Sequence, residues 1–366
     1  MTGQSPRTPR RLSGLLADMA AGHPSGALRV DTFMATALYD PEGGYYSRAE
    51  AIGGQRRDFS TIPSLSPLLG RAVALWALSL PDTGRGSLDI IEVGAGGGHL
   101  AEAILKAAGW WARRRICYRI VEISPRLRQA QQEHLVGSRV TWHAGVAEAM
   151  AETMAETMAE GAQPVVISNE LVDAFPCRCL RYEKGTWREL RLRWPPSADD
   201  PLSSHPLEDL DPACFSALQR ENWSGGIIPA GQVIEIHASY RDWLGKWASV
   251  ARGLHHLTID YGDVMPGLYR DRPTGTLRGY HAHQRLTGGA VWRAPGKVDL
   301  TCDVNFSDLE AWGIECGLHT MEMTDQAGFL ARWLPGKLTA SPSAELAAIM
   351  DPDGAGGAFK VLWQKG

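Results

Sequence analysis

The chain lacks the long apolar segments and the one-sided charge that mark two broad classes of protein. No window approaches the ~18 consecutive apolar residues that a membrane-spanning helix requires. Lysine and arginine total 37 against 41 acidic residues, so the formal net charge is -4. Broad nucleic-acid binding requires a basic surface, and this balance argues against it. We therefore expect no membrane span and no nucleic-acid partner.

Cysteine is scarce, and its spacing predicts no metal site. The six cysteines are scattered, and Cys177 and Cys179 lie too close together for a zinc knuckle. His281 and His283 form an H-x-H pair, but a metal site needs further ligands that converge in space. We therefore expect reduced thiols, as in a cytosolic protein, and no metal.

The N-terminus also lacks the apolar segment of a secretory signal peptide. Residues 1–25 are polar and contain arginine, and we expect them to be a disordered lead-in of a bacterial cytoplasmic protein. The alternative, for a eukaryotic source, is a transit peptide and the mitochondrial matrix.

What the chain does contain is a regular alternation of strand and helix patterns. Apolar runs bounded by turn residues alternate with amphipathic segments, a pattern typical of a parallel sheet covered by helices on both faces. The predicted strands cover residues 88–93, 116–124, 140–144, 164–170 and 254–262.

We expect five regions along the chain. They are a disordered lead-in (1–25), a helical N-terminal region that closes over the active site (26–87), a Rossmann-like core (88–176), an insertion with a hairpin around Lys184-Gly185 (177–232), and the remainder of the core with a second insertion at 263–305 (233–366).

The first predicted core strand runs into the glycine-rich stretch EVGAGGGHL. A dinucleotide-binding turn needs G-x-G-x-x-G, and the position of its third glycine is held here by His99. The phase is G-x-G-x-G, which lets the backbone approach a ligand without forming a tuned pyrophosphate cradle. Glu92, just before the glycines, suits an ammonium group better than a pyrophosphate.

The second strand ends in Glu122, whose carboxylate can accept hydrogen bonds from both hydroxyls of a ribose. The two acids and the glycine turn together describe a pocket for S-adenosylmethionine, and an NAD enzyme with an aberrant turn is the alternative. The predicted cofactor-binding residues are Glu92, Gly94, Gly96, Gly98, Glu122, Ile123 and Asn169.

Polar residues also end the fourth and fifth strands. Asn169, Glu170 and Asp173 follow one, and Asp260 and Tyr261 end the other. Ligands bind at the carboxyl ends of strands in such sheets, so these residues are expected at the site. The alternative is that some of the acids only cap helices.

Eight motifs in order resemble the MidA family of class I methyltransferases, which includes a mitochondrial complex I assembly factor. They are YDPEGGYYS, DFSTIPSLSPLLG, EVGAGGGHL, VEISPRLRQAQ, NELVDAFP, TIDYG, GTLRGYHAH and PGKVDLTCDVNFSDL. The resemblance implies an α/β, Rossmann-like fold with a mostly parallel seven-stranded sheet, helices on both faces, a helical N-terminal region and a middle insertion. It implies S-adenosylmethionine as cofactor and, for the mitochondrial members, symmetric dimethylation of an arginine on a complex I subunit.

This chain departs from the family pattern at three positions. Leu65 stands where the family usually has an acid, Ala95 where it has proline and His99 where it has threonine. The departures leave the cofactor pocket intact but bear on the acceptor. A protein arginine is the leading acceptor. A small-molecule N- or O-methyltransferase and a non-catalytic cofactor-binding assembly protein stay open, as does a homodimer.

For a guanidinium acceptor, carboxylates must orient the substrate in bidentate fashion. We expect Glu170 to be the main holder, with Asp173 as its partner and Asn169 beside the cofactor. The closing and substrate-side residues are expected to be Asp58, Phe59, Thr61, Asp260, Tyr261 and His281. The alternative for the first three is a structural turn, and His281 is a candidate general base if the acceptor is a hydroxyl.

Overall fold

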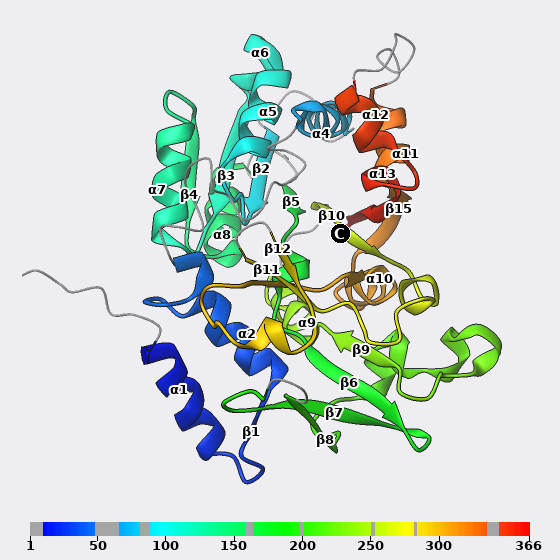
Figure 1. The fold of residues 1–366 in the computed structure, drawn as a ribbon. Helices are drawn as coiled ribbons and strands as arrows, with labels where there is room; N and C mark the ends of the chain where they lie inside the picture. The colour runs from blue at the N-terminus through cyan, green and yellow to red at the C-terminus, as the bar shows by residue number, and fades with distance from the viewer. Residues whose placement is uncertain are drawn as a thin grey trace, which may run out of the picture. The chain divides into compact units, whose positions relative to one another are not determined.

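The computed structural model describes residues 10–47, 66–80, 88–157, 164–197, 201–249, 253–281, 284–334 and 344–366. The chain divides into two compact units, each assembled from three segments (Figure 1). The large-sheet unit comprises Ser60–Asp173, Arg241–Val264 and Val304–Gly366, and the insertion unit comprises Met1–Phe59, Ala174–Tyr240 and Met265–Asp303.

The large-sheet unit has the α/β fold predicted from the sequence. Its strands lie in the order β15-β16-β10-β5-β2-β3-β4, and the short strand β14 (Val304–Asn305) adds to β10 as an eighth. The five strands from β10 to β4 are parallel, and β16 runs antiparallel to both of its neighbours. The seven strands are β2 (Leu88–Val93), β3 (Ile116–Val121), β4 (Val140–His143), β5 (Val165–Asn169), β10 (His255–Asp263), β15 (His319–Asp325) and β16 (Phe359–Lys365).

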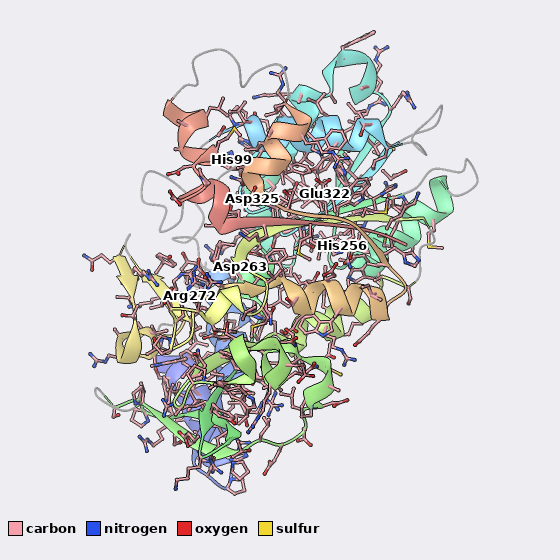
Figure 2. The ribbon with its side chains drawn as sticks, turned by 90° about the vertical axis from the view of Figure 1, so that its right-hand side faces the viewer. His99, His256, Asp263, Arg272, Glu322 and Asp325 are labelled. Carbon is pink, nitrogen blue, oxygen red and sulfur yellow. The ribbon has the colours of Figure 1, made fainter. Side chains whose placement is uncertain are left out.

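Strand order reverses beside β2, and this reversal positions the site. After β2 the chain moves outward through β3 and β4 and then returns to form β5 on the other side of β2. The carboxyl ends of β2 and β5 therefore flank a switch point, where open parallel sheets bind their ligands. His256 and Asp263 mark the start and the end of β10, two positions from β2 in the same sheet (Figure 2).

Helices cover both faces of this sheet, as the apolar strands require. Ile90 and Tyr118 pack in a core shared with α4 (Leu68–Ser79) and α5 (His99–Ala107). Side chains alternate between faces along a strand. The neighbouring buried pair Asp89 and Arg119 therefore lies on the opposite face, where Arg119 Nε is 3.8 Å from Glu152. The further helices are α6 (Gly109–Arg113), α7 (Pro125–His134), α8 (Val146–Thr157), α10 (Phe306–Glu315), α11 (Gln326–Trp333), α12 (Ala344–Met350) and α13 (Ala355–Ala358).

The insertion unit is built on antiparallel strands. One sheet has the order β1-β7-β6-β9 with β8 beside β7, and a second has the order β12-β11-β13. Phe33 of helix α2 (Val30–Tyr39) and Trp292 pack edge to face in its core. The strands are β1 (Ala27–Arg29), β6 (Arg178–Glu183), β7 (Thr186–Arg193), β8 (Leu202–Pro206), β9 (Val233–Ile236), β11 (Arg278–His281), β12 (Gln284–Leu286) and β13 (Asp299–Thr301).

The sequence was informative in this unit at one turn and misleading at two helices. The predicted hairpin is confirmed, because Lys184 and Gly185 take φ of 50° and 82° between β6 and β7. Residues 10–21, expected to be disordered, form helix α1 (Arg10–Ala21), whose Leu16 is fully buried. The amphipathic pattern of residues 235–253 predicts a helix that ends at Gly253, but the helix there is α9 (Ala238–Gly245), which ends eight residues earlier. Across the described part of the chain, none of the helices combines the length and apolar character needed to cross a membrane.

Candidate functional site

The glycine turn joins β2 to α5 at the switch point of the large sheet. Gly94, Gly96 and Gly98 have φ of 69°, 53° and 81°, a region that residues with a side chain rarely adopt. An added Cβ on Gly94 would come within 2.7 Å of Leu171, whereas one on Gly96 would meet no atom within 4 Å. The turn is therefore packed on its inner side and open at Gly96, where a ligand can approach the backbone.

Glu92 lies inside the sheet directly before this turn. Its side chain is 2% exposed, and the hydroxyl of Tyr118 on β3 donates a hydrogen bond of 2.6 Å to Glu92 Oε2. Burial raises the pKa of Glu92 to about 7, and the Tyr118 hydrogen bond opposes this shift. A positive group that binds beside this buried carboxyl stabilises its ionised form, so the carboxyl favours binding of a cation.

Glu122 follows β3 and is held in place by its surroundings. Oε1 accepts a 2.9 Å hydrogen bond from the backbone N–H of Ser124, and Oε2 accepts one of 3.0 Å from Gln131. Burial is the main cause that raises the pKa of Glu122. The adjacent Ile123 is 63% exposed, unusual for a large apolar side chain beside a buried acid.

Gln131 links the two halves of this pocket, and the sequence analysis missed it. Its Nε2 donates to Glu122 and also, at 2.9 Å, to the carbonyl of Gly96, while its Oε1 accepts from Trp142 Nε1 at 3.1 Å. Gln131 is completely buried on the otherwise polar helix α7. A glutamine at the inward position of a helix that follows an acid-ending strand is the signal that would have found it.

Asn169 and Glu170, at the carboxyl end of β5, are the first two residues of the candidate acceptor site. Asn169 Nδ2 donates to Glu170 Oε1 at 3.3 Å, and Asn169 Oδ1 is buried without a hydrogen-bond partner. Glu170 has φ of 49°, a backbone conformation that costs a non-glycine residue about 1 kcal/mol or more. The 2.9 Å bond from its N–H to the carbonyl of Ile259 holds this conformation.

Asp260 organises the loop that carries these residues. It is fully buried, and its Oδ2 accepts hydrogen bonds from the backbone N–H groups of residues 171, 172 and 173 at 3.2, 2.9 and 3.2 Å. We predicted a substrate-side position for Asp260. In the structure its carboxylate binds backbone N–H groups of the loop, and a contact with substrate stays a prediction. Burial, followed by the negative charges of Asp173 and Glu170, raises the pKa of Asp260, while its backbone N–H donors act in the opposite direction.

Asp173 completes a group of three neighbouring carboxyls. It is 5% exposed, and the hydroxyl of Tyr261 donates a short hydrogen bond to its Oδ2. The sheet thus brings Glu170, Asp173 and Asp260 together from two adjacent strands, as the strand ends predict. When these carboxyls are ionised, their mutual repulsion and burial destabilise the site. A cationic ligand reduces this electrostatic cost.

The structure does not test four of the predicted site residues. Asp58, Phe59 and Thr61, like the divergent Leu65, fall outside the described residues. His281 belongs to the insertion unit, where its Nδ1 lies 2.9 Å from the carbonyl of Lys297. Their roles at the site stay predictions.

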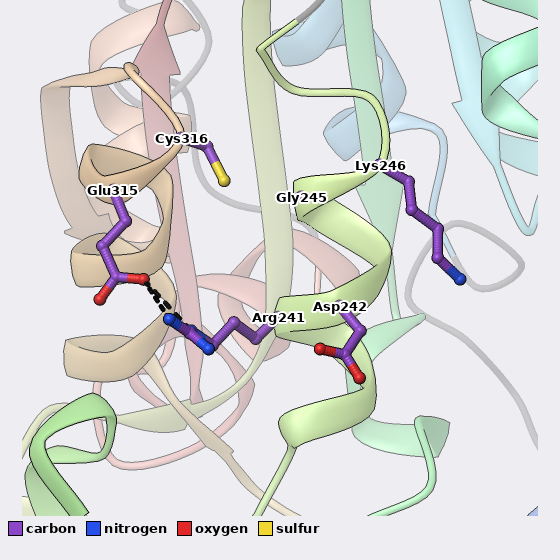
Figure 3. Close-up of a pocket in the computed structure, with 6 residues that line it drawn as sticks. All are labelled: Arg241, Asp242, Gly245, Lys246, Glu315 and Cys316. Atoms are coloured by element: carbon purple, nitrogen blue, oxygen red, sulfur yellow. Dashed lines mark hydrogen bonds and ion pairs between the residues drawn. The ribbon is translucent and has the colours of Figure 1, made fainter. Parts of the chain in front are cut away.

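A separate pocket of about 490 Å³ lies between α9 and α10 (Figure 3). Arg241 Nη2 and Glu315 Oε2, 2.8 Å apart, connect the two helices across it. The helices end here and lead into β10 and β15, so the pocket is at the amino ends of the strands. It is therefore distinct from the carboxyl-end site.

The residues at the carboxyl ends fit the S-adenosylmethionine that the sequence predicts. The open turn at Gly96 admits a ligand to the backbone, and Glu122 keeps lone pairs for ribose hydroxyls after accepting its two protein donors. The acceptor atom of Asn169 has no protein partner, and Ile123 offers an apolar surface for a base.

Comparison with known proteins supports the same ligand. Residues 68–324 match the family described as "Putative S-adenosyl-L-methionine-dependent methyltransferase". Curated relatives named "Protein arginine methyltransferase NDUFAF7, mitochondrial" include one from Xenopus tropicalis, 24% identical over 83% of this chain and 73% of its own length. Another, from Danio rerio, is 27% identical over 78% and 68%. A crystal structure from Burkholderia thailandensis, bound to S-adenosyl-homocysteine, superposes with a TM-score of 0.79 at 25% identity, covering 100% of this chain and 95% of the other.

Proposed function

Because the chain belongs to this family of S-adenosyl-L-methionine-dependent methyltransferases, we propose that it transfers the methyl group to a guanidinium nitrogen of an arginine in a protein. The observation that carries the proposal is the group of three carboxyls, Glu170, Asp173 and Asp260, at the ends of β5 and β10. A planar cation with paired N–H donors is the acceptor that such a group accommodates best. The names of the curated relatives support the same acceptor.

In this proposal the cofactor lies along the carboxyl ends of β2 and β3. Glu122 would accept hydrogen bonds from the ribose hydroxyls, Ile123 would pack on the adenine, and Glu92 would face the amino group of the methionyl end. Bound S-adenosylmethionine supplies an electrophilic methyl group on a sulfonium sulfur. The chain then has to place the acceptor in line with that methyl group, and placement alone can lower a barrier by roughly 7–11 kcal/mol.

The acceptor side is assigned to the loop after β5. Glu170 accepts the N–H groups of the guanidinium and takes the proton that nitrogen loses as its bond to carbon forms. Asp173, fixed by Tyr261, is the second carboxylate. Asp260 is a positioning residue, because it holds the backbone of the loop through three N–H groups.

The finer parts of the proposal rest on the family resemblance. Asp58, Phe59 and Thr61 close over the methyl group, with His281 on the acceptor side, and the region covering residues 26–87 supplies this closure. The proposed target resembles a complex I subunit. The protein is proposed to act as a homodimer. The proposed compartment is the bacterial cytoplasm or, in a eukaryote, the mitochondrial matrix. The curated relatives are mitochondrial by name.

The test is transfer of labelled methyl from S-adenosylmethionine into a lysate of the host. Label in a polypeptide, recovered after hydrolysis as methylarginine, is expected. Label in the small-molecule fraction would favour the alternative N- or O-methyltransferase. Binding of S-adenosyl-homocysteine by calorimetry without any transfer would favour a non-catalytic assembly protein.

Glu170→Gln gives the sharper assignment of the acceptor holder. It keeps the size of the side chain but removes the charge, so transfer should fall by on the order of 100-fold or more while S-adenosyl-homocysteine affinity is unchanged. Glu133→Gln, an exposed change on α7, is the matched control and should behave as wild type. Full transfer by the Glu170 variant would show that another residue holds the acceptor.

A further inference from the structure

The core of the insertion unit contains a group of soft donor atoms that the methyltransferase chemistry does not use. Cys177 directly precedes β6, His237 lies between β9 and α9, and Cys302 directly follows β13. One ligand atom from each of the three lies within 4.8 Å of the other two. The residues come from segments 60 and 65 positions apart in the chain, which is why their spacing gave no signal in the sequence.

All three side chains are withdrawn from solvent. Cys177 and Cys302 are 0% exposed and His237 is 2% exposed. The two sulfur atoms are 3.3 Å apart, much longer than the about 2.05 Å of a disulfide bond. Two ligand sulfurs on one zinc ion lie about 3.8 Å apart, given Zn–S bonds of about 2.3 Å in a tetrahedron. The pair therefore needs only a small displacement to bind an ion.

His237 provides the second, independent observation. Its Nε2 atom is buried and has no hydrogen-bond partner, a costly state for an imidazole nitrogen. Burial favours the neutral imidazole, and the neutral ring is the form that binds a metal.

More sulfur surrounds this group. Met34 Sδ on α2 lies 3.6 Å from Cys177 Sγ, and the buried Cys179 lies beside Cys177. Thiol, thioether and imidazole donors without a carboxylate among them select a thiophilic ion over magnesium or calcium. A divalent ion with two thiolates and a neutral imidazole is electrically neutral, which suits a core without solvent.

We propose that Cys177, His237 and Cys302 bind one Zn²⁺ ion, with Met34 or Cys179 next to the remaining position. As the ion binds, the two thiols release two protons and both sulfurs bond to zinc as thiolates. Because both thiols must lose their protons to bond to the ion, zinc binding weakens as pH falls.

The role of this site is structural, because it connects three separate segments of one unit. The loop before β6 is already joined to the start of α9 by a 2.5 Å hydrogen bond from Ser239 Oγ to the carbonyl of Pro176. An ion would add the segment after β13 to the same junction. The proposal is independent of the acceptor and of the carboxyl site in the large-sheet unit.

The primary test is the metal content of the purified full-length wild-type chain, prepared without a metal-affinity tag. Elemental analysis should give one zinc per chain, and zinc X-ray absorption should show two or more sulfur neighbours with at least one nitrogen. A chain that is metal-free after supply of Zn²⁺, with all six thiols reduced, overturns the proposal. A mass lower by about 2 Da from a Cys177–Cys302 disulfide overturns it as well, and bound copper overturns the choice of ion.

Variants then locate the ion. Cys302→Ser and His237→Asn should each lose most of the zinc and melt several degrees lower, whereas Cys316→Ser, at a half-buried thiol of the large-sheet unit, should keep the full equivalent. Co²⁺ supplied during refolding should give thiolate-to-cobalt absorption in the wild type and in Cys316→Ser only. Retention of zinc by both cluster variants would place the ion elsewhere.

Discussion

The two units bury charged groups in different ways, and the difference follows from strand direction. Parallel strands bring all their carboxyl ends to one edge, so in the large-sheet unit Glu92, Glu122, Glu170 and Asp173 gather there from distant parts of the chain. Antiparallel strands send alternate ends to opposite edges. In the insertion unit the buried Glu189 instead lies within an antiparallel sheet, where two arginine side chains of the same unit neutralise it.

Glu189 on β7 is the clearest case in the insertion unit. It is 1% exposed, and it accepts hydrogen bonds from Arg178 Nε at 2.7 Å and Arg191 Nε at 3.0 Å. Glu122 of the large-sheet unit is also buried, at 4% exposed, but it accepts hydrogen bonds from a backbone N–H and an amide and from no guanidinium. One carboxylate is saturated by cations of the chain, and the other retains capacity for a ligand.

The largest effect that this contrast predicts is on stability. Glu189→Ala should lower the free energy of unfolding by about 3–5 kcal/mol, because it leaves two buried guanidinium groups without their carboxylate. Denaturant titration measures the loss. The affinity of the folded fraction for S-adenosyl-homocysteine should be unchanged. A loss of affinity in this variant would show that Glu189 affects ligand binding as well as stability.

The matching change in the other unit should act on binding. Glu122→Ala removes the acceptor assigned to the ribose hydroxyls and should weaken S-adenosyl-homocysteine binding on the order of 100-fold, given about 1.5–3 kcal/mol for a hydrogen bond to a charged group. Calorimetry gives the affinity, and Glu133→Ala on α7 is the control. Wild-type affinity in Glu122→Ala would remove Glu122 from the cofactor site.

Glu92 should give cofactor binding a pH dependence. Its pKa is raised to about 7, and the ammonium group of the ligand favours the ionised carboxylate, so affinity should fall about tenfold between pH 8 and pH 6. Glu92→Gln should flatten this profile while keeping the Tyr118 hydrogen bond.

The stability of the ligand-free protein should respond to the same group with the opposite sign. Its pKa in the folded protein lies above the ordinary 4.5. The stabilisation that Glu92 gives the folded state is therefore complete below about pH 4.5 and is lost as pH rises through about 7. Subtracting the unfolding free energy of Glu92→Gln from that of wild type across this range isolates it. A difference that is constant with pH would show that Glu92 titrates normally.

The smallest effect concerns the orientation of Asp173. Tyr261→Phe removes one hydrogen bond to this carboxylate and should slow methyl transfer about 2–10-fold, with cofactor affinity unchanged. Tyr280→Phe in the insertion unit, which removes a hydroxyl bonded to Arg278 at 3.1 Å, is the matched control. Equal rates in the two variants would show that the Asp173 contact does not position the acceptor.

The parallel part of the fold was predictable because it is encoded locally. The strand of residues 88–93 is buried throughout, and Gly94–Gly98 turns into a helix as its glycine pattern indicates. The same reasoning placed Glu122 and Glu170 at strand ends. It also assigned Asp260 to the substrate side, but it could not show that this carboxylate accepts three backbone N–H groups, because those contacts leave no sequence pattern.

The antiparallel part was less predictable because its partners are remote in the chain. Ala27 pairs with Arg193, and Cys177 meets Cys302, through contacts that no local period records. Helix α1 was missed because it follows a polar, arginine-containing N-terminus that matches a disordered leader, although Leu12 and Leu16 form an apolar stripe that is buried. Sequence patterns therefore revealed the catalytic framework better than they revealed the unit inserted into it.

The position of β16 in the sheet has a consequence for biosynthesis. This strand lies between β10 and β15, and it is formed by residues 359–365. On the ribosome, β10 therefore exposes an unsatisfied edge until residues 359–365 are made, roughly a hundred residues after β10 itself, and β15 has no strand partner until the same moment. Nascent chains stalled before residue 359 should consequently be prone to aggregation and chaperone capture, even though every residue of the carboxyl site has already emerged.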